Sequence, residues 1–293
     1  MGKCTQGGKA EIIKELRSQG HELKHLLKAL CMPKSTYYYE ISKTDAIKER
    51  DKEITKVIKE IHHHHKGRYG VRRVYQELRN QGYEINHKRV QRIMHDNGLF
   101  GKRPKEKYHS YKGDAGKTTI NIIDRDFTTT APLQKWTTDV SQFNFPWGKC
   151  YISPILDMHT NEIISYDLST SPNLDQIKRM LTRAFEKHSY LHGLILHSDQ
   201  GWQYQHAYYQ NELKSHGIVQ SMSRKGNCYD NSIMETFFGR MKNEMYYGHE
   251  KEYGSFKEFQ KAVKEYIHYY NNERIQKKTK WMTPVQYRLS SIC

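Results

Sequence analysis

The sequence predicts an α/β protein in which a basic, helical N-terminal region precedes a domain built on a mixed five-stranded sheet. Three observations lead to this fold class. The 293 residues are enough for roughly two domains of about 100–200 residues each. Apolar residues follow helical spacing over the first hundred positions, whereas β-rich segments and helices alternate from about residue 136 onwards. An apolar fraction of 36% and an aromatic fraction of 12% are sufficient for a packed core, so a disordered chain is not expected.

Positive charge is concentrated in the first part of the chain. The net charge is +16; residues 1–115 carry 26 Lys and Arg against 14 Asp and Glu, and residues 116–293 carry 22 against 18. A basic segment joined to a nearly neutral one predicts a nucleic-acid-binding region attached to a second function. The alternative is a charge surplus that only improves solubility.

Two classes of protein are excluded by the sequence. No apolar run approaches the roughly 18 residues that a membrane span needs, and the N-terminus lacks the apolar segment of a signal peptide. The five cysteines are odd in number and form no C-x-x-C pair, so neither a disulfide framework nor a zinc ribbon is indicated. We therefore expect a cytoplasmic protein without a membrane partner.

The first segment, residues 1–45, is predicted to be a helix-turn-helix. Apolar residues at helical spacing mark helices over 10–16 and 23–30, and Ser35 can cap a short helix through Tyr39 after the turn at 32–35. The second helix of such a unit enters the major groove of DNA. An ordinary helical hairpin remains the alternative.

The second segment, residues 46–105, also resembles a helix-turn-helix in outline. Three apolar stripes predict helices, and five cations lie near helix starts, where they can contact phosphates: Arg72, Arg73, Lys88, Arg89 and Arg92. The alternative is a small helical bundle with a solvated basic face. The four histidines at 62–65 would spread around a helix by about 100° each, so they are not expected to share one metal ion.

Residues 106–130 are predicted to be a basic linker, because the stretch 101–118 contains Gly, Pro, Lys and Tyr without periodicity. Residues 131–293 are predicted to form the catalytic domain. Strands are expected at 136–145, 149–157, 162–168, 194–197 and 218–222, with a hairpin turn at 146–148. Helices are expected at 174–188, 207–215, 231–246 and 256–270.

Three carboxylates of this domain can carry chemistry. Asp139 lies on the first strand, Asp199 follows the fourth strand, and Glu235 lies near the start of a helix. Acids from separate elements can converge at the strand ends and hold divalent cations through oxygen ligands. Two such ions can activate an attacking oxygen and stabilise the leaving oxygen at a phosphodiester.

Each acid also has a structural interpretation. Glu235 fits a capping box with Ser232, and Asp199 could be a turn residue. Asp139 is harder to explain in this way, because a buried carboxylate without a partner costs several kcal/mol. Asp157 and Asp230 are further acids nearby, which are interpreted either as structural or as supporting the three acids from behind. Glu235 and Lys242 are seven residues apart and share a helix face, so both could face one DNA strand.

These motifs carry a family resemblance. W-T-T-D at 136–139, H-S-D-Q-G at 197–201 and S-R-K-G-N-C-Y-D-N-S-I-M-E at 223–235 resemble the D, D-x35-E pattern of retroviral-integrase-type transposases. R-Y-G-V-R-R at 68–73, R-V-Q-R-I-M at 89–94 and Y-Y-N-N-E-R at 269–274 resemble the second-frame transposases of bacterial insertion-sequence family three. The resemblance runs from about residue 10 to 290.

The resemblance implies an RNase H-like catalytic domain that uses Mg²⁺ or Mn²⁺, with two ions expected. Asp139, Asp199 and Glu235 would be the catalytic, metal-binding triad, and Lys225 and Lys242 would lie near DNA. The implied activity is cleavage of the ends of an insertion sequence followed by joining of the 3′-hydroxyls to DNA. A metal-dependent nuclease that does not join, and a DNA-binding regulator without activity, are the alternatives.

The resemblance also implies partners. These are double-stranded DNA, as terminal repeats and target, further copies of the chain on paired ends, and an upstream-frame fusion partner. A location at the bacterial nucleoid would follow.

Overall fold

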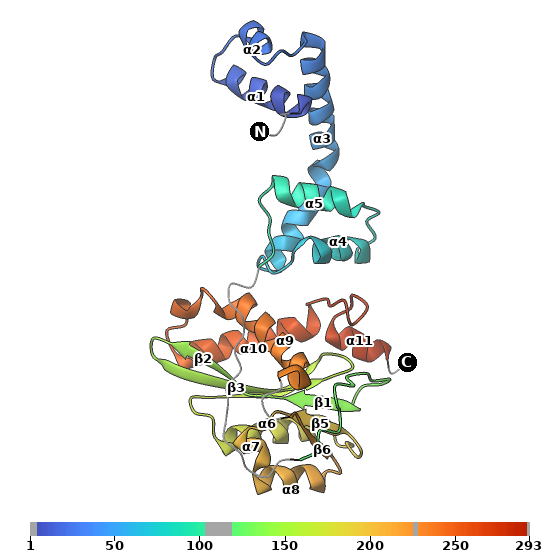
Figure 1. Cartoon of the computed structure of the whole chain (residues 1–293), viewed down its shortest axis with the longest axis vertical. Coiled ribbons are helices and arrows are strands. Elements are labelled where there is room, and N and C mark those ends of the chain that lie inside the picture. Colours follow the sequence, from blue (N-terminus) through green and yellow to red (C-terminus); the bar gives the residue numbers. More distant parts are fainter. Residues whose placement is uncertain (1–4, 103–118, 225–227, 292–293) are drawn as a thin grey trace. The chain divides into compact units, whose positions relative to one another are not determined.

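The computed structural model describes residues 5–102, 119–224 and 228–291 (Figure 1). The chain divides into two compact units, Met1–Gly101 and Lys102–Cys293. Of the expected linker at 106–130, residues 106–118 lie outside the described residues. Among the helices that are described, none combines the length and the apolar character that crossing a lipid bilayer requires.

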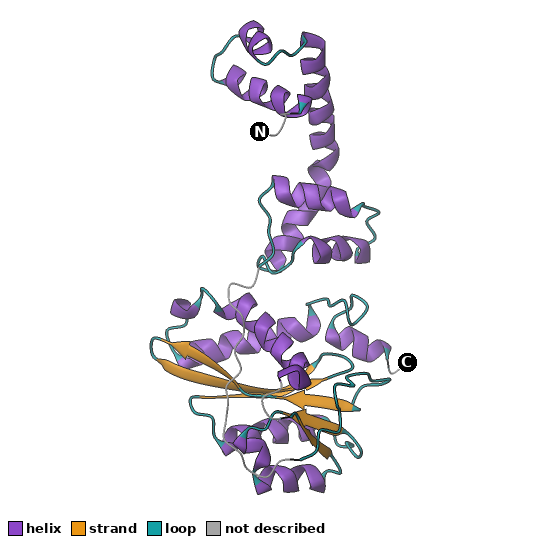
Figure 2. Cartoon of the chain, in the orientation of Figure 1, coloured by secondary structure: helices purple, strands orange, loops and turns teal. Residues whose placement is uncertain are grey.

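The first unit is helical (Figure 2). Its helices are α1 (Gln6–Ser18), α2 (Leu23–Ala29), α3 (Lys34–His64), α4 (Val71–Asn80) and α5 (His87–Asp96). The side chains of Ala10, Ile13, Met32 and Tyr37 join α1 to the start of α3 in a small core. Farther along, α3 contributes Ile54, Ile58 and Ile61 to the buried residues that lie under α4 and α5.

The third helix is much longer than expected. A short helix ending near Tyr39 and a domain boundary at 45/46 were predicted, but α3 runs without a break through both positions. The sequence from Lys34 to His64 contains no Gly or Pro, so nothing in it interrupts the helical hydrogen bonds. The prediction of a short helix ending near Tyr39 is therefore wrong, and one helix runs through both predicted segments.

The second unit is the predicted α/β domain. Its strands are β1 (Lys135–Thr138), β2 (Ser141–Phe145), β3 (Gly148–Asp157), β4 (Ile163–Ser169), β5 (Ile195–Ser198) and β6 (Val219–Met222). Its helices are α6 (Leu174–Lys187), α7 (Trp202–Gln205), α8 (Ala207–Ser215), α9 (Ser232–Met241), α10 (Phe256–Asn272) and α11 (Pro284–Ser290). Short helical turns are η1 (Cys228–Asn231), η2 (Lys242–Tyr246), which is π-helical, and η3 (Glu250–Glu252).

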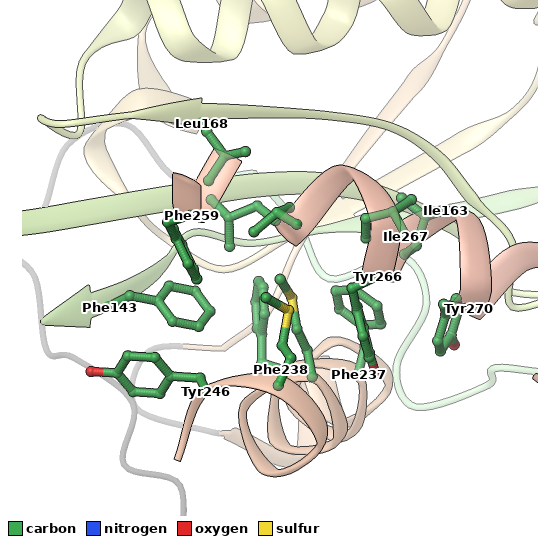
Figure 3. Packing of buried hydrophobic residues seen from close by; sticks show 14 of the residues in the cluster. Phe143, Ile163, Leu168, Phe237, Phe238, Tyr246, Phe259, Tyr266, Ile267 and Tyr270 are labelled. Atoms are coloured by element: carbon green, nitrogen blue, oxygen red, sulfur yellow. The ribbon is translucent and has the colours of Figure 1, made fainter. Parts of the chain in front are cut away.

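The sheet is mixed. β4 and β3 pair antiparallel, β3 pairs antiparallel with β2 and β1, and β5 and β6 continue from β1 in parallel. The hairpin predicted at 146–148 is confirmed, because Phe145 pairs with Gly148. α9 and α10 cover one face of the sheet and α6 and α8 cover the other (Figure 2). Figure 3 shows aromatic residues of α9 and α10 packed against β2 and β4.

The sheet has six described strands instead of five because the strand expected at 136–145 is divided. Trp136 pairs with Asp157 and Ser141 pairs with Ile152, so β1 and β2 keep one register against β3. This register places Pro154 opposite Asp139, and proline has no N–H to donate to a ladder. The interruption therefore falls at the residue whose side chain was expected to carry chemistry.

Candidate active site and DNA-binding residues

Asp139 lies immediately after β1, in the break between β1 and β2. Its Oδ1 accepts a hydrogen bond from the backbone N–H of Val140 at 2.7 Å. This bond holds the carboxylate against its own backbone, where the strand pairing is interrupted. Asp139 is therefore fixed in direction by the local backbone, with its second oxygen, Oδ2, making no hydrogen bond within the described residues.

Asp199 directly follows β5, which runs parallel to β1. Thr137 pairs with His197, so Asp139 and Asp199 come two residues later at the same end of neighbouring strands. Oδ1 of Asp199 accepts the N–H of Gly201 at 2.9 Å. The carboxyl ends of parallel strands meet at one edge of a sheet, which brings these two acids together as predicted.

Glu235 lies near the start of α9, and two hydrogen bonds fix this helix start on β1. The Thr137 hydroxyl donates to Asn231 Oδ1 at 2.6 Å, and Asn231 Nδ2 donates to the carbonyl of Thr138 at 3.4 Å. The capping box considered for Ser232 and Glu235 is not formed in the described structure, where Asn231 is the N-cap and no side chain caps the helix. Among the residues that the structure describes, Glu235 thus has no hydrogen-bond partner at the helix start.

The charges of these groups act on one another. Burial raises the pKa of Asp139 well above its usual value, and the neighbouring carboxylates of Asp199 and Glu235 raise it further, while Lys242 opposes the shift. Burial also raises the pKa of Asp199 and that of Glu235. Three carboxylates and one ammonium therefore share a site of reduced polarity.

Lys242 begins the π-helical turn that follows α9, and only 9% of it is exposed. Burial lowers the pKa of Lys242 to about 8, and the charge of Asp139 counteracts this effect. Its ammonium lies 5.0 Å from the centre of the Phe143 ring on β2. The side chain therefore lies on the sheet side of α9, near Phe143 and within the electrostatic influence of Asp139.

The three acids do not form a compact ligand cluster. Within the residues that the structure describes, no three His, Cys, Asp or Glu side chains are gathered closely enough to hold a metal ion. Asp199 and Glu235 are nevertheless near enough to raise the pKa of Asp139. Such an arrangement suits a centre in which like charges move together only when a cation is present.

Asp157 and Asp230 are structural, as interpreted from the sequence. Asp157 Oδ1 accepts the N–H groups of His159 and Thr160, and its Oδ2 accepts the Trp136 indole N–H. Asp230 is fully buried, and its many donors occupy both oxygens: Asn121, Arg125 and the backbone and side chain of Arg224. These bonds hold η1, the turn that directly precedes α9, and so help to position the helix that carries Glu235.

Tyr204 is a residue of the site that the sequence analysis missed. It is fully buried on α7, and its hydroxyl lies 3.4 Å from that of Thr138. Burial raises its pKa, and the charges of Asp139 and Asp199 raise it further. Its position five residues after Asp199, in a short helix, was the available signal. Tyr204 is therefore a buried residue close to both aspartates.

The predicted DNA-binding cations fall into two groups. Arg89 and Arg92 both bind Asp51 on α3, with Arg89 Nε donating to Asp51 Oδ1 at 2.8 Å. Burial opposes ionisation of Asp51, but the two guanidiniums outweigh it and lower its pKa. These arginines therefore also hold α5 on α3, a role that the sequence did not reveal.

The other cations are more available. Arg72 at the start of α4 and Lys88 at the start of α5 are exposed. Arg73 lies over the ring of Tyr69, 5.6 Å from its centre. Lys225 lies outside the described residues.

Comparisons with known proteins agree with this architecture. Family models described as an HTH-like domain and an integrase core domain match residues 49–107 and 129–228, and a second integrase core model matches 235–292. The chain is 46% identical to the putative transposase InsK for insertion sequence element IS150 of Escherichia coli (strain K12), over 95% of this chain and 97% of that protein. The chain belongs to the IS3 family of insertion-sequence transposases.

Two further likenesses concern other members and the fold. An uncharacterised transposase-like protein of Haemophilus influenzae (strain ATCC 51907 / DSM 11121 / KW20 / Rd) is 55% identical over 71% of this chain and 95% of its own length. The HTLV-2 integrase catalytic core domain in complex with magnesium is 15% identical, with a TM-score of 0.43 over 54% of this chain and 97% of that chain. Membership of the IS3 transposase family confirms the predicted function, DNA transposition and integration, by a polynucleotidyl transferase with an integrase-type core.

Proposed function

We propose that this IS3-family transposase cleaves the ends of its element and joins the freed 3′-hydroxyls to target DNA, using divalent cations held by Asp139, Asp199 and Glu235. The observation that carries the proposal is that two carboxylates, Asp199 after β5 and Glu235 on α9, raise the pKa of buried Asp139 at the end of β1. Carboxylates that raise the pKa of a neighbouring acid favour the binding of a cation, because the cation removes the repulsion between them.

The donor set fits Mg²⁺ or Mn²⁺. In the described residues, each aspartate uses one oxygen for a backbone N–H, and Glu235 has no hydrogen-bond partner, so carboxylate oxygens remain for a hard cation. When bound, two such ions would supply activation of the attacking oxygen and stabilisation of the leaving oxygen. The protein orients the metal ligands, because the hydrogen bonds of Asp139 and Asp199 to backbone N–H groups keep both carboxylates at one end of the sheet.

Lys242 and the chain around it orient the DNA. Its ammonium, with a pKa of about 8, is predominantly charged at neutral pH and can bind a phosphate beside the carboxylates. Tyr204 and the buried strand ends exclude water from one side of the site. Water attacks in the first step and a 3′-hydroxyl in the second, and neither step needs a covalent protein intermediate.

The N-terminal helices are proposed to hold the terminal repeats. Arg72 and Lys88 are exposed at helix starts, where backbone N–H groups also favour phosphate. Arg50, Arg89 and Arg92 surround Asp51, and Arg92 also pairs with Asp96 at 3.5 Å. Three cations against two acids leave a positive charge that can still attract DNA. Arg73 and Lys225 complete the set predicted from the sequence.

Higher assembly is part of the proposal. Joining two element ends to one target needs two active sites, so the chain is expected to act as a homo-oligomer on paired ends. An upstream-frame fusion partner would add DNA contacts, and a location at the nucleoid follows from binding DNA.

The test is a reaction on a supercoiled plasmid that carries the DNA flanking this gene, with Mg²⁺ and purified full-length protein. Wild type should produce end-specific nicks and joined products, and Asp199→Asn should produce neither. Asp175→Asn, on the exposed side of α6, is the matched control and should behave as wild type. Cleavage without joining would show a nuclease. If Asp199→Asn retained activity, the assignment of the triad would be refuted.

A further inference from the structure

A basic groove runs along the free edge of the sheet. Its volume is about 790 Å³, and its walls come from β4, α6 and α10. Within the described residues β4 pairs only with β3, so its other side faces this groove. Of the fourteen lining residues one is acidic, Asp167, whereas five are cationic: Arg183, Lys187, Lys257, Lys261 and Lys264. The catalytic mechanism uses none of these cations.

Three of the lysines form a row on one face of α10. Lys257, Lys261 and Lys264 follow the spacing i, i+4, i+7, which covers about 10.5 Å along the helix axis. All three are exposed. In the described part of the chain none of them forms an ion pair, whereas Lys187 is paired with Glu162 at 2.9 Å. The row is therefore an uncompensated line of positive charge.

The groove is not suited to an added β-strand. The Asn271 side chain already bonds both the N–H and the carbonyl of Ile163, each at 2.9 Å. Arg183 donates to the carbonyl of Tyr166 at 2.7 Å. An incoming strand needs such edge groups for its own hydrogen bonds, and charged side chains along an edge also discourage pairing.

A second copy of the chain is equally unsuited to the groove. A two-fold interface places the same surface on both partners, so Lys257, Lys261 and Lys264 would face the lysines of the other copy. A partner with regularly spaced negative charge removes this repulsion. The phosphate backbone of DNA has that property, because its charges repeat at a fixed spacing along each strand.

The row is directed toward the catalytic end of the sheet. β4 and β1 are both antiparallel to β3, so the end of β4 at Ser169 lies on the same side as Asp139. α10 runs opposite to β4, because Asn271 binds Ile163 at one end and Phe259 lies by Leu168 at the other (Figure 3). Lys257 is therefore the member of the row nearest the catalytic end, and Lys264 is the farthest from it.

From this arrangement we infer that the groove formed by β4, α6 and α10 binds the phosphate backbone of duplex target DNA. The inference rests on the proposed function, which requires a second DNA besides the element end. Lysines bind phosphates without reading bases, which suits a target of any sequence. The helix-turn-helix residues remain available for the element ends.

The test uses the full-length triple variant Lys257→Gln/Lys261→Gln/Lys264→Gln. Binding to a fluorescent duplex of arbitrary sequence is measured between 50 and 200 mM salt, in EDTA, so that no reaction occurs. Three lost phosphate contacts should reduce the magnitude of the slope of log affinity against log salt by about 2.7. Between 50 and 200 mM salt, the affinity of the variant should therefore fall about 40-fold less than that of wild type. In Mg²⁺, joining should need more target DNA, while cleavage of the element ends stays as in wild type.

Two control variants separate the groove from net charge. Lys149→Gln/Lys214→Gln/Lys277→Gln removes the same charge from exposed lysines outside the groove and should keep the wild-type slope. Changing the three groove lysines to Arg should keep the slope as well, because the charge is retained.

Equal salt slopes for the groove variant and the control variant would overturn the inference. This result would mean that the groove binds no ligand or that it binds an acidic protein instead of DNA. Failure of the wild type to cleave element ends would refute the proposed function instead, and the binding slopes would still decide the groove.

Discussion

Replacing Arg274 by methionine removes one member of a buried ion pair that joins the segment just after α10 to the π-helical turn η2. The Arg274 side chain is 1% exposed and that of Glu244 is 8% exposed. Arg274 Nη2 donates to Glu244 Oε1 at 2.6 Å and Nε donates to Oε2 at 3.0 Å, while the Tyr266 hydroxyl donates to Oε2 at 3.1 Å. Burial opposes the charged guanidinium, but Glu244 outweighs it and raises the pKa of Arg274.

The loss of folding stability in Arg274→Met follows from the buried carboxylate of Glu244 that the change leaves without its cation. In Arg274→Met the carboxylate of Glu244 stays buried and loses the guanidinium, while the Tyr266 hydroxyl can still donate to it. Removing one partner of a buried pair costs about 3–5 kcal/mol. With a urea dependence of about 2 kcal/mol per molar, the midpoint of unfolding should fall by about 2 M. Urea unfolding, followed by tryptophan fluorescence, measures this shift.

A double variant tests the cause. In Glu244→Gln/Arg274→Met no lone charge is buried, so at least half of the lost stability should return. A loss below about 1 kcal/mol in Arg274→Met, or a double variant less stable than the single one, would show that the pair does not act as described.

Three other predictions concern the remaining chain. Arg72→Gln should weaken binding to end DNA severalfold without changing the unfolding midpoint, because Arg72 is exposed; unchanged affinity in a gel-shift titration would remove it from the interface. Hydrogen bonds from Arg224 and Arg125 outweigh burial and hold the pKa of Asp230 well below its usual value. The stability from Asp230 is therefore present above about pH 4 and is lost as the pH falls through the lower folded value. Acid unfolding of Asp230→Asn should therefore depend less on pH below 4 than that of wild type. Burial raises the pKa of Cys150 to about 12, so native protein should resist alkylation there while exposed Cys31 reacts, as peptide mass spectrometry can show.

Local signals in the sequence predict the elements that carry Asp199 and Glu235. The apolar run before Asp199 marks a strand end, and the pattern around Met234 and Phe238 marks the helix that carries Glu235. The break at Asp139 could not be predicted in this way. It depends on Pro154, which becomes relevant only when the register of β1 against β3 is known.

The cations were predicted less well than the acids. Arg89 and Arg92 have the spacing of a basic helix face, and only the packing of α5 on α3 reveals Asp51 as their partner. The length of α3, in contrast, was readable from the lack of Gly and Pro over 34–64. Local composition thus determined helix extent, whereas pairing between distant charges required the tertiary structure.

The continuity of α3 has a geometric consequence for DNA. At about 1.5 Å per residue, its 31 residues form a rod of about 46 Å, close to the length of 14 base pairs at about 3.4 Å each. One residue inserted into this rod moves its ends apart by about 1.5 Å and also turns one end by about 100°. In any complex where both ends of α3 touch the same duplex, the helix therefore fixes two quantities together. These are the distance between the two contact sites and the rotation of one site relative to the other about the helix axis.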